Sequence, residues 1–302
     1  MVRLRTPSGG AAAPGERSII LCADDYALTP GVSAGIQELA ELGRLSATSA
    51  VVTTPHWAAH ARRLVDLRPR LAIGLHLNLT LGAPLGPMPN FAPAGELPKL
   101  PALLVNALAG RIPHREVVNE VSRQLERFET ALGYPPDFID GHQHVHALPG
   151  LRKAVVCALR QRYAGRRPLV RDPVDRPVAI IARRVAAMKS LTLAALATGF
   201  GAMARKSELQ TNHGFSGVST FNESVPYGRE LDRFFAYPGP RHLVMCHPGH
   251  PDAELVRLDP VVGRRKAELE TLRHAPDLQA RLWRPVRTSV DGELQWPRVS
   301  AS

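Results

Sequence analysis

The chain has 302 residues, of which 44% are apolar and 22% charged, as is ordinary for a globular protein with a sizeable core. Three scattered cysteines in apolar surroundings exclude a disulfide framework and predict reduced thiols in a cytoplasmic protein. The net charge of +11 is unusual, but the arginines are spread along the chain without interleaved aromatic residues, so we expect no nucleic-acid partner.

Residues 1–17 are rich in Gly, Ala and Pro and lack the apolar core of a secretory signal, so we predict a disordered lead-in. Residues 18–290 show neither an internal repeat nor a boundary, which predicts a single domain, and residues 291–302 are expected to form a C-terminal tail. No apolar run reaches the roughly 18 residues that a membrane-spanning helix needs, so none is expected.

The first part of the domain alternates between apolar runs and helical patterns. Thr29-Pro30-Gly31 is typical of a helix start, and Gly43 is placed to end that helix. Pro55 would stand in the first turn of a second helix. The expected strands are 18–23, 47–53 and 71–76, and the expected helices are 29–42 and 55–67. Strands that alternate with helices over short connections predict a parallel sheet or barrel.

A long segment rich in Pro and Gly, residues 78–113, interrupts this alternation. Long loops in compact domains are usually functional lids or insertions. Because the segment directly follows His76, we predict that it shapes a substrate cleft, with an inert excursion as the alternative.

The alternation resumes at residues 114–132, where Val117, Val121, Leu125 and Phe128 recur at helical spacing. The remaining expected strands are 137–140, 168–171 and 241–246, and the expected helices are 149–163, 177–206 and 260–273, with a shorter helical piece to 282. Basic residues flank the apolar stretch 191–200, a pattern that could favour an anionic membrane surface. We expect this helix to pack on the sheet instead.

Polar side chains follow four of the apolar strands: Asp24-Asp25, His76, His142 to His146, and His247. The carboxyl ends of parallel strands meet at one face, where the active sites of α/β barrels lie. Adjacent acids at the end of a buried strand must be solvated, paired or bound to a cation. Either aspartate could instead cap a helix, and His76 alone could be a core histidine. The joint placement predicts that the four segments form one site.

His142, His144 and His146 alternate with other residues, so an extended backbone would place all three imidazoles on one face. Imidazoles and one carboxylate suit Zn²⁺, Mn²⁺, Fe²⁺, Co²⁺ or Ni²⁺, and Mg²⁺ less well. A bound ion would acidify a water and polarise a carbonyl, while an aspartate accepts the proton and a histidine protonates the leaving amine. The pattern predicts metal-dependent hydrolysis, and the spacing does not choose among the three histidines.

These motifs resemble the YdjC-like carbohydrate deacetylases, a family that includes chitooligosaccharide deacetylases and hopanoid-associated members. The resemblance spans roughly residues 19 to 273 and rests on Ala23-Asp24-Asp25-Tyr26, Gly74-Leu75-His76-Leu77, the segment 140–146 and His247-Pro248-Gly249. It implies an α/β fold, a distorted TIM-like (β/α) barrel into which the Pro/Gly-rich loop is inserted. It also implies a homodimer that removes the N-acetyl group from an N-acetylated mono-, oligo- or lipid-linked sugar and releases acetate.

The resemblance further implies which residues bind the metal and which acts as the base. Asp25, His76 and His142 look like the ligands of one divalent ion, with zinc and magnesium as the first candidates. Asp24 looks like the base that activates the water. Tyr26 stands where the family often has Phe, which preserves an aromatic ring and adds a hydroxyl group.

For the acid and the substrate contacts, the resemblance leaves alternatives open. His247 looks like the acid or a transition-state stabiliser, and His144, His146 and His250 compete for that role. Arg171, at the end of the strand 168–171, is expected to contact the substrate, as are His144 and His146.

Two other functions fit the same residues. A metal-dependent phosphoesterase or amidohydrolase would use the same ligands on another bond, and phosphate release would distinguish the phosphoesterase from a deacetylase, which releases acetate. A non-catalytic sugar- or lipid-binding protein would use the cleft alone.

Overall fold

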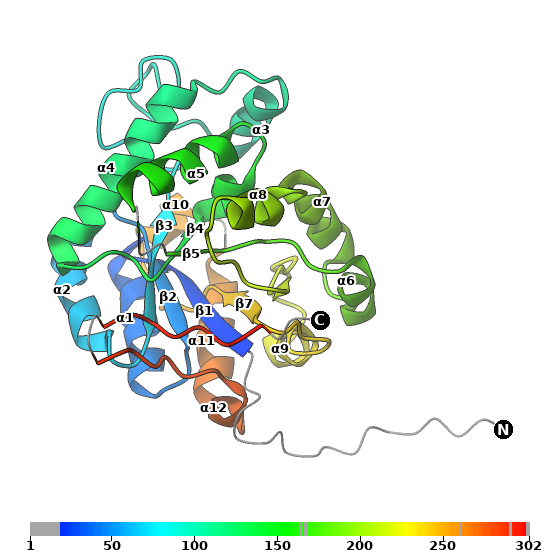
Figure 1. Ribbon diagram of the computed structural model, residues 1–302. Coiled ribbons are helices and arrows are strands. Elements are labelled where there is room, and N and C mark those ends of the chain that lie inside the picture. The colour runs from blue at the N-terminus through cyan, green and yellow to red at the C-terminus, as the bar shows by residue number, and fades with distance from the viewer. Residues whose placement is uncertain (1–18, 164, 166–167, 260, 290–291, 300–302) are drawn as a thin grey trace.

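The computed structural model describes residues 19–163, 165, 168–259, 261–289 and 292–299 (Figure 1). The predicted lead-in 1–17, Ser18, Pro260 and parts of the predicted C-terminal tail lie outside these residues. Within the described chain, seven strands form one sheet in the order β5-β4-β3-β2-β1-β7-β6, and all neighbours are parallel. The strands are β1 Ile19–Tyr26, β2 Ala47–Ala50, β3 Ala72–Leu77, β4 Phe138–Gly141, β5 Leu169–Val170, β6 Phe215–Ser216 and β7 His242–Cys246.

The sheet curls so that its two edges approach each other. The amide of Val170 in β5 donates to the carbonyl of Gln210 at 2.8 Å, and Val170 forms a parallel bridge with Thr211, four residues before β6. The predicted distorted (β/α) barrel is therefore confirmed, although the two edge strands have only two residues each. Short edge strands leave the barrel incompletely closed.

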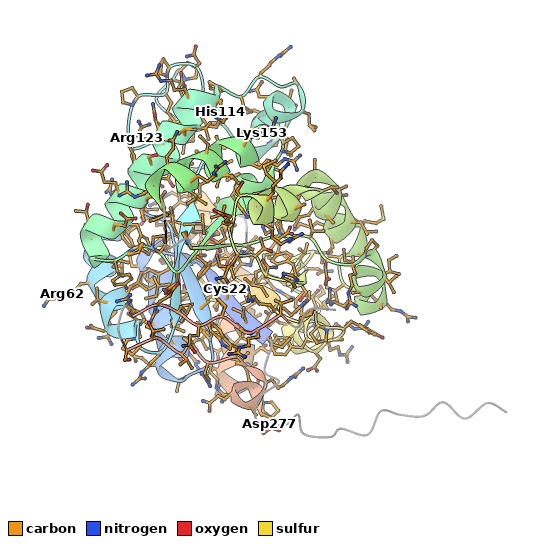
Figure 2. All side chains as sticks on the ribbon, in the orientation of Figure 1. Cys22, Arg62, His114, Arg123, Lys153 and Asp277 are labelled. Atoms are coloured by element: carbon orange, nitrogen blue, oxygen red, sulfur yellow. The ribbon has the colours of Figure 1, made fainter. Side chains whose placement is uncertain are left out.

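Alternate residues of each strand face opposite sides of the sheet. In β1, Ile20 and Cys22 pack inside the barrel, whereas Leu21 and Ala23 pack against the outer helices. Figure 2 shows Cys22 at the centre of the molecule and the side chains of Arg62, Arg123 and Asp277 at its periphery. Both faces of the sheet are buried, so β1 and β3 begin with apolar runs and carry their polar side chains near their carboxyl ends.

Helices surround the sheet, as Figure 1 shows. The first, α1, begins at Pro30 after Thr29, whose Oγ1 accepts from the amide of Val32, and α4 ends at Gly133, which has a left-handed φ of 78°. The helices are α1 Pro30–Glu41, α2 Trp57–Leu67, α3 Leu100–Leu108, α4 His114–Leu132, α5 Leu151–Arg162, α6 Pro177–Arg183, α7 Ala187–Ala197, α8 Phe200–Lys206, α9 Tyr227–Phe234, α10 Leu255–Leu258, α11 Gly263–His274 and α12 Leu278–Arg281.

The segment 78–113 is an ordered insertion that contains α3. Carboxylates of α4 hold its loop: Glu116 accepts from the amides of Asn90 and Phe91, and Glu120 accepts from the amide of Leu85. A loop tied down by buried and half-buried carboxylates can keep α3 at a fixed position above the sheet.

The stretch 177–206 is mostly helical, as predicted, and it is divided into the three helices α6, α7 and α8. Left-handed φ angles at Arg184 and Ala186 end the first piece, and Thr198 with Gly199 separates the other two. The prediction that no apolar run is long enough for a membrane-spanning helix is corrected by this region. Residues Ala187–Lys206 are long and apolar enough by length and composition, with 28% of the best window buried, although the break at Gly199 divides them as folded.

Candidate metal centre and its cavity

The predicted site residues converge at the carboxyl ends of four strands. Asp24 and Asp25 lie near the end of β1, His76 near the end of β3, His142 directly after β4 and His247 directly after β7. All line one cavity of about 610 Å³. Parallel strands that neighbour one another in the sheet place their ends at the same edge, which explains why segments far apart in sequence meet.

A bulge at the end of β1 turns both aspartates toward this cavity. Consecutive side chains of a regular strand point to opposite faces. Here the pairing of β1 with β2 slips between Ala23 and Tyr26, and Asp25 has a left-handed φ of 71°. The extra residue redirects the backbone, so Asp24 and Asp25 both line the cavity.

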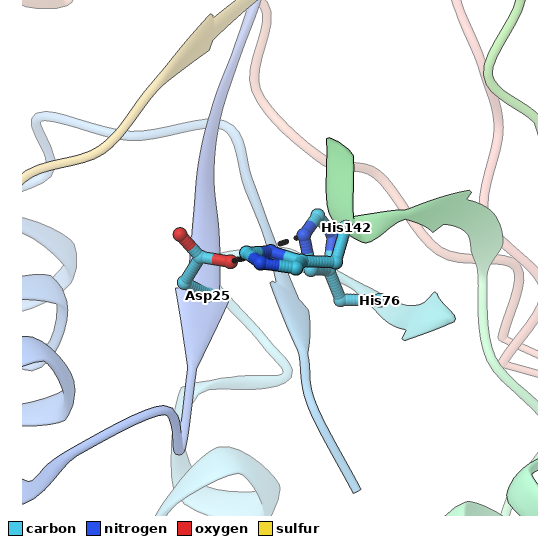
Figure 3. Close-up of side chains that lie close together, drawn as sticks. All are labelled: Asp25, His76 and His142. Atoms are coloured by element: carbon cyan, nitrogen blue, oxygen red, sulfur yellow. Dashed lines mark hydrogen bonds and ion pairs between the residues drawn. The ribbon is translucent and has the colours of Figure 1, made fainter. Parts of the chain in front are cut away.

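Asp25, His76 and His142 form the first half of the site (Figure 3). The Oδ1 atom of Asp25 lies 3.1 Å from Nε2 of His76 and 3.0 Å from Nδ1 of His142. One ligand atom from each of the three residues falls within 4.8 Å of the others. One carboxylate and two imidazoles are a common three-ligand set for a catalytic transition metal, so these residues fit a divalent ion.

The second carboxylate oxygen of Asp25 is fixed by an arginine. The other oxygen of Asp25 accepts from Arg265 of α11 at 2.6 Å, and the same guanidinium pairs with Asp259. Although burial alone would raise it, Arg265 and His142 hold the pKa of Asp25 well below its usual range. The carboxylate is therefore ionised, as a metal ligand must be.

His76 is oriented by Asp140, whose Oδ1 lies 2.7 Å from Nδ1 of the imidazole. This contact leaves Nε2 to face Asp25. Burial would lower the pKa of His76, but Asp140 and Asp25 together raise it to about 10. A carboxylate behind a histidine is the usual outer partner of a metal-bound imidazole, and metal binding at Nε2 would release a proton.

Asp24 and Arg171 form the second half of the site. The guanidinium of Arg171 donates to both carboxylate oxygens of Asp24, each at 2.6 Å, and also lies 2.5 Å from Asp140. Burial would raise the pKa of Asp24, but Arg171 holds it well below its usual range. A continuous chain of contacts thus runs from Asp24 through Arg171, Asp140 and His76 to Asp25.

The expected substrate contact of Arg171 is corrected by this placement. Its side chain is 0% exposed and is absent from the cavity wall, because the guanidinium is occupied by Asp24 and Asp140. His146 is likewise fully buried, and its Nε2 donates to the carbonyl of Arg171 at 2.8 Å. Both residues act on the site through their neighbours.

The prediction that His142, His144 and His146 share one extended face is wrong. Residues His142–Ala147 form a 3₁₀ segment in which Gln143 and His144 have left-handed φ angles of 54° and 60°. This turn sends His142 toward Asp25 and brings the ring of His144 against Phe215, at 5.5 Å between ring centroids. His144 does line the cavity, so a substrate contact stays a prediction for that residue.

His247 lines the same cavity, and its Nδ1 is buried without a hydrogen-bond partner among the described residues. Burial lowers its pKa to about 4, so the imidazole is neutral at neutral pH. His250, the other candidate from this motif, pairs with Glu38 on the surface and does not line the cavity.

The cavity has two unlike regions. We name the polar floor after the strand-end side chains and their buried partner, which are Asp24, Asp25, His76, His142, His247 and Arg265. We name the apolar wall after the helix and loop side chains above them, which are Leu100, Leu104, Leu193, Leu196, Phe221 and Leu258. Leu100 and Leu104 belong to the segment 78–113, which the sequence predicts to shape the cleft. Sequence reasoning missed the other wall residues, Arg265 and the role of Asp140. Only Asp140 carried a signal, since it lies two residues before His142.

A family model described as YdjC-like protein matches residues 18–282 of the chain. The chain belongs to the YdjC-like family. Among YdjC-like relatives, a chitooligosaccharide deacetylase of Klebsiella pneumoniae (strain 342) is 32% identical over 244 residues, 80% of this chain and 85% of the relative. A chitooligosaccharide deacetylase of Yersinia pestis (strain Pestoides F) is 37% identical over 148 residues, 49% of this chain and 57% of the relative.

A solved structure shares the fold. It is described as a candidate cellobiose-phosphate cleavage protein from Enterococcus faecalis V583, and it superposes with a TM-score of 0.63 at 24% identity. The match covers 87% of this chain and 92% of that chain. The curled parallel sheet with its surrounding helices is thus found in a crystal structure as well.

Proposed function

We propose that this protein hydrolyses the N-acetyl group of an N-acetylated sugar, releasing acetate and a free amine, and that the reaction requires one divalent metal ion. The observation that carries the proposal is that two adjacent carboxylates have different partners. Asp25 faces two imidazoles, whereas Asp24 faces an arginine. The names of the relatives, chitooligosaccharide deacetylases at 32% and 37% identity, support the substrate class.

Asp25, His76 and His142 would hold the ion in this proposal. When bound, a divalent ion polarises the acetyl carbonyl and acidifies a water molecule. Imidazole donors suit zinc better than magnesium, so zinc is our first candidate. Arg265 balances the charge of the second Asp25 oxygen, which keeps that carboxylate from binding a proton instead.

Asp24 would accept the proton of the attacking water. Arg171 fixes both carboxylate oxygens, so the side chain has one orientation. Oδ1 also accepts from the thiol of Cys22, which leaves a second lone pair on Oδ2 for the proton. The same guanidinium weakens Asp24 as a base by lowering its pKa. An acidified water offsets this loss, because its proton is easier to remove.

His247 would carry the proton to the leaving nitrogen. With a pKa of about 4 it is neutral before the reaction, so it must first receive a proton. We propose that the proton gained by Asp24 passes through His247 to the amine as the C–N bond breaks. The unpartnered Nδ1 atom supports a role in contact with substrate.

The apolar wall bears on the choice among mono-, oligo- and lipid-linked sugars. Aliphatic side chains such as Leu104, Leu193 and Leu196 gain free energy by covering an apolar group. They offer no hydrogen bonds to sugar hydroxyls, whose burial without partners is costly. We therefore propose that the preferred substrate carries an apolar group next to its N-acetylated sugar.

The test is a metal analysis of the purified protein followed by acetate release from N-acetylglucosamine, short chitooligosaccharides and an alkyl N-acetylglucosaminide. We expect acetate release that chelation abolishes and zinc restores, with the alkyl glycoside as the best substrate. Phosphate release from phosphoesters in the absence of any acetate release would favour the phosphoesterase. Binding of these sugars without turnover at any metal would favour the non-catalytic function.

A further inference from the structure

Exposed apolar side chains gather on the helices that line the cavity. Among the described residues, the six most exposed large apolar side chains range from 58% to 79% exposed. They are Val105 and Leu108 on α3, Val178 and Ile181 on α6, Met188 on α7 and Val256 on α10. Residues of α3, α7 and α10 line the cavity, and α6 directly precedes α7. Single exposed apolar residues are ordinary, but a group around a cavity marks an interaction surface.

The exposed side chains continue the apolar wall outward. Leu100, Leu104 and Leu108 recur every four residues on α3, so they lie on one helix face. The first two line the cavity and the third is 65% exposed. On α7, Met188 lies one turn before Thr192, which lines the cavity. We name Val105, Leu108, Met188 and Val256 the apolar rim.

The charge around α3 and from α6 to α8 has one sign, whereas the acidic residues Asp252, Glu254 and Asp259 lie beside Val256 at α10. The sequence has no acidic residue between Glu96 and Glu116, around α3, or between Asp175 and Glu208, from α6 to α8. Exposed basic residues lie in the same stretches: Lys99, Arg111, Arg184, Arg205 and Lys206. With the net charge of +11, an anionic surface is the complementary partner.

We propose that the apolar rim docks on an anionic phospholipid bilayer, with the mouth of the cavity toward the lipid. Apolar side chains on separate helices would enter the interface between headgroups and acyl chains, while the neighbouring Lys and Arg side chains meet the phosphates. In this orientation the apolar wall of the cavity would adjoin the acyl chains of the lipid. For residues 191–200, where the sequence favours packing on the sheet over membrane contact, this proposal chooses membrane contact. The docking does not depend on the deacetylase reaction.

The experiment is flotation of the full chain with vesicles of phosphatidylcholine, with and without phosphatidylglycerol, at low and high salt. We expect flotation with the mixed vesicles at low salt and much less with pure phosphatidylcholine. The variant V105E/M188E should float at least about tenfold less, because two apolar insertions are lost and two acids are added. The control V65E/V286E changes charge equally at apolar residues that are 41% and 55% exposed on other elements, and it should float like the wild type.

Three outcomes would overturn the docking. They are no flotation of the wild type, an equal loss in V65E/V286E, or a wild-type dimer that V105E/M188E dissociates while neither protein binds vesicles. The last result would assign the rim to a second copy of the chain. Acetate release from a soluble sugar is measured on the same samples and should be equal in wild type and V105E/M188E. If acetate release is absent but flotation persists, the proposed function fails and the docking stands.

Discussion

The polar floor and the apolar wall enclose the same cavity but are built in opposite ways. Most floor residues come from strand ends, and both aspartates are fixed by arginines, Asp24 by Arg171 and Asp25 by Arg265 of α11. Wall residues come from the insertion and from helices and a loop later in the chain, and they contribute aliphatic side chains and Phe221. The difference indicates that the chemistry and the choice of substrate reside on separate elements. Substitutions should therefore alter one and spare the other.

The largest effect is expected from the ligand half of the floor. Asp25→Ala and His142→Ala should each lose both bound metal and acetate release, because each removes a donor from a three-ligand set. Elemental analysis and an acetate assay measure this. His250→Ala, a surface histidine of the same chain, is the matched control and should keep both. Retention of metal by Asp25→Ala would refute the ligand assignment.

A substitution of Asp24, the proposed base, should lower turnover without changing metal binding. Asp24→Asn keeps the shape of the side chain but removes its basicity, so kcat should fall by about 10²–10⁴-fold while metal content is unchanged. Steady-state kinetics on a metal-loaded sample measure this. Full activity of Asp24→Asn would show that another group takes the proton.

Behind the floor, Asp140 links the two halves through His76 and Arg171. Asp140→Asn should weaken metal affinity by about 10–100-fold, because it removes the carboxylate that orients His76. A competition titration with a chromogenic chelator measures the affinity. Asp137→Asn, in the same stretch but paired with Arg287 away from the cavity, should leave it unchanged. Equal losses in the two variants would indicate general destabilisation.

Substitutions in the apolar wall should lower kcat/KM only for substrates that carry an apolar group. Leu104→Ala and Leu193→Ala should each lower kcat/KM for an alkyl N-acetylglucosaminide by about tenfold, since part of a leucine's burial energy of about 1.5–3 kcal/mol is lost. The value for a soluble chitooligosaccharide should not change. Leu42→Ala, 45% exposed and outside the cavity, is the control. A uniform loss on both substrates would place the wall in the reaction itself.

The smallest effect on activity is expected for a buried histidine outside both regions, which acts on folding stability. His242 contacts Ser216 Oγ at 2.9 Å, and burial, aided by Arg183, lowers its pKa to about 4. Its unfolded pKa is about 6.5, so between these pH values the unfolded chain binds more protons and stability falls as the pH falls. The free energy of unfolding should drop by at most about 3 kcal/mol from this group, and His242→Gln should flatten the slope. Urea titrations at several pH values measure it, with acetate release at neutral pH unchanged.

The sequence by itself determined the local elements and the composition of the floor. Helix 114–132 was predicted to the residue, because its apolar spacing is a local signal. The polar residues that end β1, β3, β4 and β7 follow apolar runs, so their convergence could be predicted from the rule for parallel strands. The sequence could not place the three histidines after β4, because the left-handed turn at Gln143 and His144 has no glycine to mark it.

Only the tertiary structure decided which groups hold the site and what surrounds it. Arg265 meets Asp25 across 240 positions of sequence, and nothing local distinguishes it from the other arginines. Arg171 was expected near the substrate from its place after the strand 168–171, but its burial against Asp24 and Asp140 depends on the packing of β5 beside β4. The apolar wall brings together residues of α3, α7 and α10, which lie far apart in the sequence and line the same cavity. Long-range packing determines these contacts, because any pattern in a short segment is compatible with many partners.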